Sequence, residues 1–297
     1  MKTYLDCLPC FLNQALKTGR IVTSEEKILR KIIDQVMENL INIPLDAPPP
    51  KIAQTVYRTI KSITGNEDPY STIKRKQNEV ALGLYPEFKE MVIHSEDQLL
   101  FALKLAIGGN IIDLGAQREI KDIKKEILQT LSAPLTINDY KGFRRSINNS
   151  KLLLYLGDNA GEIVFDSILI EQLKKIDHLK IVFAVREKPI INDATMEDAK
   201  FVGIDKHVEV ISNGSDAPAT VLSECSTEFS DLFHKADMII AKGQGNYESL
   251  SEENKNIFFL LKVKCPVVAS HLNAKVGDTV LKRQSGEIRR PDHGSRC

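Results

Sequence analysis

The sequence predicts an α/β protein in which a helical first half precedes a parallel or mostly parallel sheet. Apolar residues recur at helical spacing through much of the first half, whereas short, continuous apolar runs separated by helical stretches begin near residue 152. Strands that alternate with helices indicate a parallel sheet. Such strands are covered on both faces and are therefore continuously apolar, as these runs are.

Four segments of the first half carry the helical spacing: residues 28–40, 52–63, 99–109 and 116–131. Thr23 and Glu26 have the spacing of a capping box before the first segment, and Ser95 and Gln98 have it before the third. Gly65 is expected to end the second helix, because glycine is the residue best suited to the left-handed position after a helix. The first half is therefore expected to be all helical.

Five apolar runs are expected to be strands: residues 152–156, 180–185, 207–211, 236–241 and 266–269. The polar stretch SINNS suggests a domain boundary near residue 148. We therefore expect a helical domain over residues 1–148 and an α/β domain over residues 149–282. Residues 283–297 have no apolar periodicity and are expected to form a loose tail.

The composition is that of an ordinary globular protein. Lys and Arg together number 40, as do Asp and Glu, so nothing indicates a general attraction to nucleic acid or to a membrane surface. No apolar run is long enough to span a bilayer, and the N-terminus lacks the apolar stretch of a signal peptide. Five cysteines, an odd and sparse number, argue against a disulfide scaffold. We expect a cytoplasmic protein, and the sequence leaves its oligomeric state open.

The segment GDNAGE, directly after the run 152–156, contains the first candidate site. Ligands of open α/β sheets collect at the carboxyl ends of strands, where Asp158, Asn159 and Asp193 would supply three oxygen ligands. Hard divalent cations such as Mg²⁺ and Mn²⁺ prefer such ligands. Two alternatives stay open: GDNAGE as an ordinary tight turn, and Asp193 as the N-cap of a helix.

A second candidate site is KGQGNYE, which follows the run 236–241. Its glycines would let backbone N–H groups approach an anion, and Lys242 adds positive charge. Lys264, near a later strand end, could be a second cation for phosphate. The alternatives are a flexible turn capped by Asn246 and, for Lys264, a solvated surface lysine.

Two further motifs have uncertain roles. Asn110 and Asp113 lie at a break between apolar segments, which is either a helix C-terminus or a surface facing the crevice. Cys7 and Cys10 form a CxxC pair, which could be half of a zinc site or a redox pair. Because no second close pair of cysteines accompanies it, a structural or dispensable role is favoured.

The segments GDNAGE, INDAT and KGQGNYE, in this order, resemble the metal-dependent damage-control phosphatases, a family that includes proteins once called acidic-residue methyltransferases. The segments DCLPC, DPYSTIKRKQN, AIGGNIID and KVKC also match. The resemblance covers roughly residues 1 to 280. The N-terminal CxxC resembles the stand-alone archaeal and bacterial branch of the family.

The resemblance implies a helical N-terminal domain packed on a three-layer α/β/α, Rossmann-like domain. It implies a divalent cation (Mn, Co, Ni or Mg) held by Asp158, Asn159 and Asp193, and phosphatase activity on sugar phosphates or damaged phosphorylated metabolites. Lys264 matches the last lysine of a basic motif in relatives, but Leu261 and Lys262 replace its Arg-Thr. The other residues implied near the substrate are Lys242, Glu162, Asn110 and Asp113.

The mechanistic hypothesis is metal-assisted hydrolysis of a phosphomonoester, with Asp158, Glu162 and Lys242 as the catalytic residues. Lys242 and backbone N–H groups would stabilise transition-state charge, and Asn246 and Lys264 would contact the substrate. Either water or a carboxylate could attack. The DxD pattern expected of an aspartyl-phosphate enzyme is absent from GDNAG, so activated water is favoured, with Glu162 orienting it or supporting the metal.

Two other functions stay open at this point. One is a carboxylate methyltransferase that uses S-adenosylmethionine, although GDNAGE places an acidic residue where that cofactor would approach the backbone. The other is a regulator that binds a metal or metabolite without turnover, which the fold class alone does not exclude.

Overall fold

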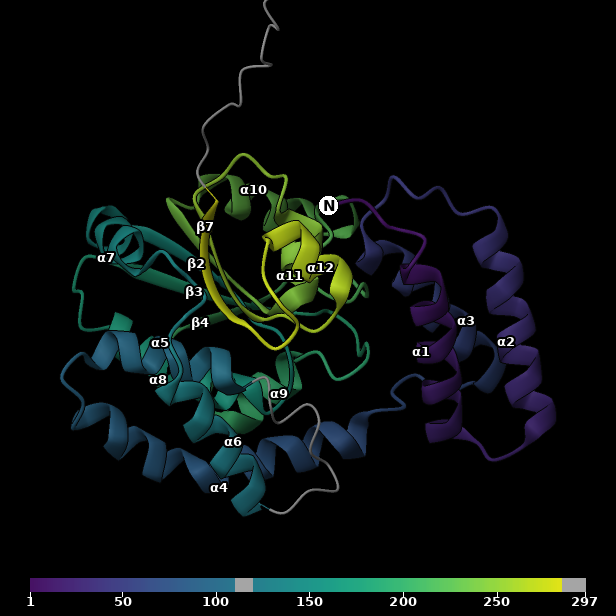
Figure 1. Ribbon diagram of the computed structural model, residues 1–297, viewed down its shortest axis with the longest axis horizontal. Helices are drawn as coiled ribbons and strands as arrows, with labels where there is room; N and C mark the ends of the chain where they lie inside the picture. Colours follow the sequence, from purple (N-terminus) through teal and green to yellow (C-terminus); the bar gives the residue numbers. More distant parts are fainter. Residues whose placement is uncertain (110–119, 285–297) are drawn as a thin grey trace, which may run out of the picture.

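The computed structural model describes residues 1–109 and 120–284, which form a mixed α/β fold (Figure 1). Within these ranges one sheet contains seven strands in the order β1-β7-β6-β5-β2-β3-β4. Neighbouring strands are parallel except for β6 and β7, which are antiparallel. The prediction of a mostly parallel sheet is therefore confirmed.

The strands are β1 (Ile137–Asn138), β2 (Leu152–Leu156), β3 (Lys180–Val185), β4 (Glu209–Ser212), β5 (Met238–Lys242), β6 (Ile257–Lys262) and β7 (Thr279–Gln284). The helices of the described ranges are α1 (Cys7–Val22), α2 (Glu26–Ile41), α3 (Pro49–Thr64), α4 (Ser71–Ile93), α5 (Gln98–Gly108), α6 (Ile120–Ser132), α7 (Tyr140–Asn149), α8 (Glu162–Leu173), α9 (Met196–Val202), α10 (Thr227–Lys235), α11 (Gly243–Leu250) and α12 (Pro266–Leu272).

Each face of the sheet has its own hydrophobic core, because successive side chains of a strand point to opposite faces. On β2, Leu153 and Tyr155 belong to the core shared with helices α4 to α9. Leu154 and Leu156 belong to the core shared with α10, α11 and α12. The strands are apolar throughout because both faces are buried, and the result is a three-layer α/β/α arrangement.

Helices α1, α2 and α3 form a third core, which contains Phe11, Val36 and Val56. They lie together to one side of the sheet in Figure 1. Helices α4 to α7, in contrast, pack into the core of the sheet, which includes Phe88 of α4 and Phe143 of α7. The expected boundary near residue 148 thus falls between elements that share one core.

The prediction of a strand at residues 266–269 is wrong, because these residues begin α12. Pro266 stands in the first turn of the helix, where its missing N–H costs nothing, whereas a central strand needs that donor. The Cys265 sulfur accepts a hydrogen bond from the N–H of Val268 at 3.5 Å and caps the helix. The strand of this region is β6, which ends just before.

The two predicted capping boxes are also wrong. Helix α2 has Glu25 at its N-cap, and the Thr23 hydroxyl accepts a bond from the Glu25 N–H instead. Helix α5 begins at Gln98, and its cap is Asp97, whose carboxylate accepts a bond from the Leu100 N–H at 3.0 Å. In both cases the helix begins later than the spacing suggested.

Some expectations lie partly or wholly outside the described residues. Strand β7 includes residues 283 and 284, the first two of the expected tail, and the remainder of the tail is not described. Asn110 and Asp113 also fall outside the described ranges. Among the helices of residues 1–109 and 120–284, none combines the length and the apolar character needed to cross a membrane.

Candidate active site

The candidate site lies at the carboxyl ends of β2 and β5, which are neighbours in the middle of the sheet. From β2 the chain continues through β3 to one edge, and from β5 it continues through β6 towards the other. Ligands of open α/β sheets bind at such a switch point. Gly157 and Asp158 follow β2, and Lys242 ends β5.

Backbone contacts join the two loops that carry the predicted metal ligands. A single antiparallel bridge pairs Asn159 with Asp193. The Ala194 N–H donates to the Asp158 carbonyl at 2.8 Å. The three predicted ligands therefore come together, as their positions at neighbouring strand ends suggested.

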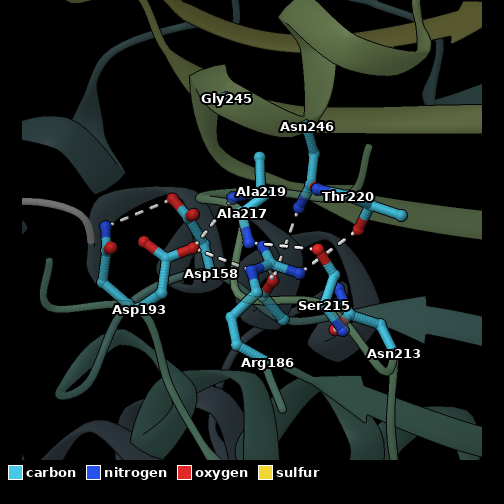
Figure 2. Close-up of polar contacts among 12 residues, drawn as sticks. Asp158, Arg186, Asp193, Asn213, Ser215, Ala217, Ala219, Thr220, Gly245 and Asn246 are labelled. Carbon is cyan, nitrogen blue, oxygen red and sulfur yellow. Dashed lines mark hydrogen bonds and ion pairs between the residues drawn. The ribbon is translucent and has the colours of Figure 1, made fainter. Parts of the chain in front are cut away.

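The Asp158 and Asp193 side chains are 8% and 3% exposed. Figure 2 shows their carboxylates next to one another. The Asn159 amide donates to Oδ2 of Asp158 at 3.2 Å and to Oε1 of Glu162 at 2.8 Å. This pair of bonds fixes the orientation of the amide between the two acids.

Two buried acids of this site, Asp158 and Glu162, have raised pKa values. Burial raises the pKa of Asp158 well above normal, and the charges of Glu162 and Asp193 raise it further. The positive charges of Lys264 and Arg186 act in the opposite direction. Burial also raises the pKa of Glu162. Negative charge therefore exceeds its compensation in this part of the protein.

Arg186, which the sequence analysis did not single out, is the main partner of Asp193. Its guanidinium is fully buried and donates from Nε to Oδ2 of Asp193 at 2.8 Å (Figure 2). Other donors of the guanidinium reach Thr220 Oγ1 at 3.2 Å and the Gly157 carbonyl at 3.3 Å. A signal was present: an arginine directly after a buried strand needs an acidic partner.

The loop after β4 supports Asp193 from the other side. The Ala219 N–H donates to the same Oδ2 of Asp193 at 3.0 Å. Ala219 has a φ of +62°, a conformation that costs a non-glycine residue energy and recurs at functional sites. Because Oδ2 accepts bonds from both Arg186 and Ala219, Oδ1 is the oxygen of Asp193 better suited to coordinate a ligand.

Asn246 holds this arrangement together from α11. Its amide donates to the Lys242 carbonyl at 2.7 Å and to the Gly157 carbonyl at 3.4 Å. Its Oδ1 accepts from the Thr220 N–H at 2.8 Å. The side chain is fully buried, so these contacts give it a structural role, and its contact with substrate stays a prediction.

Lys242 is buried among acids. Its Nζ donates to Oδ1 of Asp166 at 2.6 Å and lies 3.6 Å from Oε2 of Glu162. Burial alone would lower the pKa of Lys242, but the charges of Asp166, Glu162 and Asp158 outweigh it and raise the pKa. The ammonium therefore stays charged, and its closest partner, Asp166, was not predicted.

Lys264 lies on the surface, after β6, and its N–H donates to Oε1 of Gln244 at 2.8 Å. Its positive charge acts to lower the pKa values of Asp158 and Glu162, against the larger effect of their burial. The charge of Lys264 therefore acts on the acids of the candidate site. The ammonium of the nearby Lys262 instead lies 3.7 Å from the carboxylate of Glu126 in α6.

Cys7 and Cys10 lie in the first turn of α1 and carry free thiols. In the described part of the chain, no group of three or more His, Cys, Asp and Glu side chains could hold a metal ion. The predicted ligand set differs from such a group, because it combines two carboxylates with the amide of Asn159.

The protein-family model named damage-control phosphatase ARMT1-like domain matches residues 3–280 of the sequence. The chain belongs to this family. The resemblance found in the sequence motifs is therefore confirmed at the level of the family, and family membership supports a phosphatase enzyme.

Similar proteins agree with this assignment to the damage-control phosphatase family. A Pyrococcus horikoshii protein named a damage-control phosphatase is 37% identical over 290 residues, which cover 97% of this chain and 100% of the relative. An Archaeoglobus fulgidus protein with the same name is 36% identical over 288 residues, covering 93% and 97% of the two chains. A crystal structure from Pyrococcus horikoshii, described as a DUF89 family protein, has a TM-score of 0.89 at 37% identity and covers 95% of this chain and 99% of that chain.

Proposed function

We propose that the chain is a phosphatase that needs a divalent cation and hydrolyses phosphomonoesters of small metabolites, such as sugar phosphates or damaged phosphorylated metabolites. The observation that carries the proposal is the convergence of Asp158, Asn159 and Asp193 from two neighbouring strand ends. Family membership supports phosphatase chemistry independently of this geometry.

The side chains of the site fit a hard cation. Two carboxylates and an amide offer oxygen donors, which Mg²⁺, Mn²⁺, Co²⁺ and Ni²⁺ accept. Burial and mutual repulsion raise the pKa of Asp158, and a cation would relieve both effects. Asp158, Asn159 and Asp193 would hold it, with Oδ1 of Asp193 facing the ion.

A divalent cation at this position would polarise the phosphoryl group and offset charge in the transition state. The chain itself would supply orientation and charge. Lys264, exposed beside the acids, would bind the phosphate of the substrate, and Lys242 would contribute positive charge from beneath them.

The attacking group in this proposal is water. The Glu162 carboxylate accepts a 2.8 Å hydrogen bond from the Asn159 amide and lies 3.6 Å from the ammonium of Lys242. These contacts support a role in holding the amide of Asn159 in place, one of the two roles expected for Glu162. Arg186 plays the corresponding part for Asp193.

The test is phosphate release from para-nitrophenyl phosphate by metal-stripped protein, with each of the four cations added back in turn. Asp158→Asn keeps the shape of the side chain and removes its charge. Asp231→Asn, an exposed position on α10, is the matched control. We expect cation-dependent turnover in the wild type and in the control, and none in Asp158→Asn.

Turnover that is indifferent to cations, or equal in Asp158→Asn and the wild type, would overturn the proposal. Tight cation binding without turnover of para-nitrophenyl phosphate or of a panel of sugar phosphates would favour a binding protein instead. If the test succeeds, the sugar-phosphate panel would identify the class of substrate.

A further inference from the structure

The segment DPYSTIKRKQN, at the start of α4, places buried polar side chains against the candidate site. Lys74, Gln77 and Asn78 are only 4%, 2% and 1% exposed. Polar groups removed from water in this way destabilise a protein unless they find partners. Their partners lie in the two loops that carry the proposed metal ligands, in helix α9 directly after the second loop, and at Asp68.

Asn78 connects the Asp158–Asn159 loop to helix α9 through one amide. Its Oδ1 accepts from the N–H of Gly161 at 2.7 Å. Gly161 ends the loop that contains Asp158 and Asn159, has a φ of +81°, and precedes the first residue of α8. The amide thus satisfies an N–H that the start of a helix otherwise leaves without a partner.

The other end of the amide reaches the Asp193 loop through α9. Nδ2 of Asn78 donates to Oδ1 of Asp198 at 3.0 Å. Oδ2 of Asp198 accepts from the N–H and the hydroxyl of Thr195 at 3.0 and 2.8 Å. The Thr195 side chain in turn accepts from the Asp198 N–H, which completes a capping box. Thr195 lies two residues after Asp193, so the cap anchors that ligand's loop.

Lys74 and Gln77 strengthen the same connection. The Lys74 ammonium lies 3.4 Å from Oδ2 of Asp198 and 3.0 Å from Oδ2 of Asp68, so it provides a buried positive charge beside both carboxylates. Oε1 of Gln77 accepts from the Asn192 amide at 3.4 Å, directly before Asp193. Helix α4 therefore contacts both ligand loops, although it contributes none of the proposed ligands.

We infer that Asn78 is a positioning residue, which fixes the separation of the Asp158–Asn159 loop from the Asp193 loop and thereby sets the affinity of the site for a divalent cation. The inference rests on the proposed function. A cation selects ligands that are already in place, because metal sites must be held within about 0.5 Å of their geometry. Loss of the Asn78 amide would leave the loops joined through their direct backbone contacts but less firmly held relative to one another, while the sheet and its cores stay intact.

The test is Mn²⁺ binding to metal-stripped protein, followed through the electron paramagnetic resonance signal of free Mn²⁺. Asn78→Ala removes both bonds. Asn39→Ala is the matched control, because Asn39 also joins two elements through its amide, to Thr59 at 2.9 Å, but between α2 and α3. We expect the Mn²⁺ dissociation constant to rise about 10- to 100-fold in Asn78→Ala and to stay unchanged in Asn39→Ala.

Two further measurements separate positioning from stability. At saturating Mn²⁺, kcat for para-nitrophenyl phosphate should recover to near the wild-type value in Asn78→Ala, whereas the Mn²⁺ concentration for half-maximal rate should rise. The Tm in chelator shows how far the variant is destabilised. If Asn78→Ala does not fold, Asn78→Ser, whose hydroxyl is too short to span both loops, takes its place with the same expectation.

A wild-type dissociation constant retained by a folded Asn78 variant would overturn the inference, and so would a fall in Tm without a change in Mn²⁺ affinity. The proposed function would survive either result. A wild type that binds none of Mn²⁺, Mg²⁺, Co²⁺ and Ni²⁺ would instead contradict the proposed function itself.

Discussion

The backbone of Gly243 lies directly against the carboxylate of Asp158. A Cβ atom on Gly243 would stand 1.8 Å from Oδ2 of Asp158, far inside van der Waals contact. Gly243 also has a φ of +79°, which side chains rarely adopt. The absence of a side chain at the first residue of α11 thus leaves the space that the Asp158 carboxylate occupies.

Gly243→Ala should displace Asp158 and reduce cation-dependent phosphatase activity roughly 100-fold, since small displacements of reacting groups have effects of this size. The measurement is kcat/KM at saturating cation. Gly65→Ala is the control: Gly65 has a similar φ of +68° but no atom within 4 Å of the added Cβ. It should lose about 1 kcal/mol of stability and keep its activity. Equal activity in both variants would contradict the expectation.

Arg186→Met should lower the free energy of unfolding by about 3 kcal/mol, because it leaves the buried carboxylate of Asp193 without its cationic partner. Urea denaturation in chelator measures the change without a contribution from bound metal. Arg30→Met breaks an ion pair with Asp34 whose side chains are 76% and 47% exposed, and should change stability by less than about 0.5 kcal/mol. Similar losses in the two variants would argue against a special role of Arg186.

Lys242→Met should also destabilise the protein by about 3 kcal/mol, because Asp166 and Glu162 would lose their buried counter-charge. Adding Asp166→Asn to this variant should restore part of the loss, since it removes one of the uncompensated charges. Urea denaturation of the two single variants and the double variant gives the coupling. Additive losses would show that the two side chains do not depend on one another.

Glu248 is expected to make stability depend on pH. Burial raises its pKa from 4.5 to about 7, so between these values the folded protein keeps a proton that the unfolded chain has released. Its contribution to stability is therefore present below pH 4.5 and is lost as the pH rises to about 7. The loss should be on the order of 2 kcal/mol, because the side chain is only half-buried.

Urea midpoints between pH 4.5 and pH 8 test this expectation. The difference between the wild type and Glu248→Gln should change across the window, because glutamine does not titrate. Glu252→Gln, at a side chain that is 74% exposed, should differ from the wild type by a constant amount. A constant difference for Glu248→Gln would contradict the raised pKa.

The strands of the central sheet could be predicted because burial on both faces makes them continuously apolar. Predictions for residues 152–156 and 180–185 match β2 and β3 residue by residue. The strand predicted at residues 266–269 was wrong because a short, continuous apolar run is also compatible with a buried helix. Pro266, the first residue of this run, was the better signal, since its ring favours the first turn of a helix.

The candidate site was predictable where its residues follow strands, and less so where they come from elsewhere. Asp158, Asn159 and Asp193 stand at neighbouring strand ends, so topology brings them together. Asn78 lies on a helix far away in sequence, and its contact with Gly161 depends on how α4 packs. Tertiary packing of this kind leaves no periodic signal in the chain.

The pairing of strand β1 limits the order in which the sheet can form during synthesis. Strand β1 pairs with β7, where Ile137 lies opposite Val280, and β7 separates β1 from β6. During synthesis β7 is made only after nearly all the chain between the two strands, so β1 can pair with it only at a late stage. We therefore expect β1 to join its edge of the sheet last, after β2, β3 and β5 have already brought the acids of the site together.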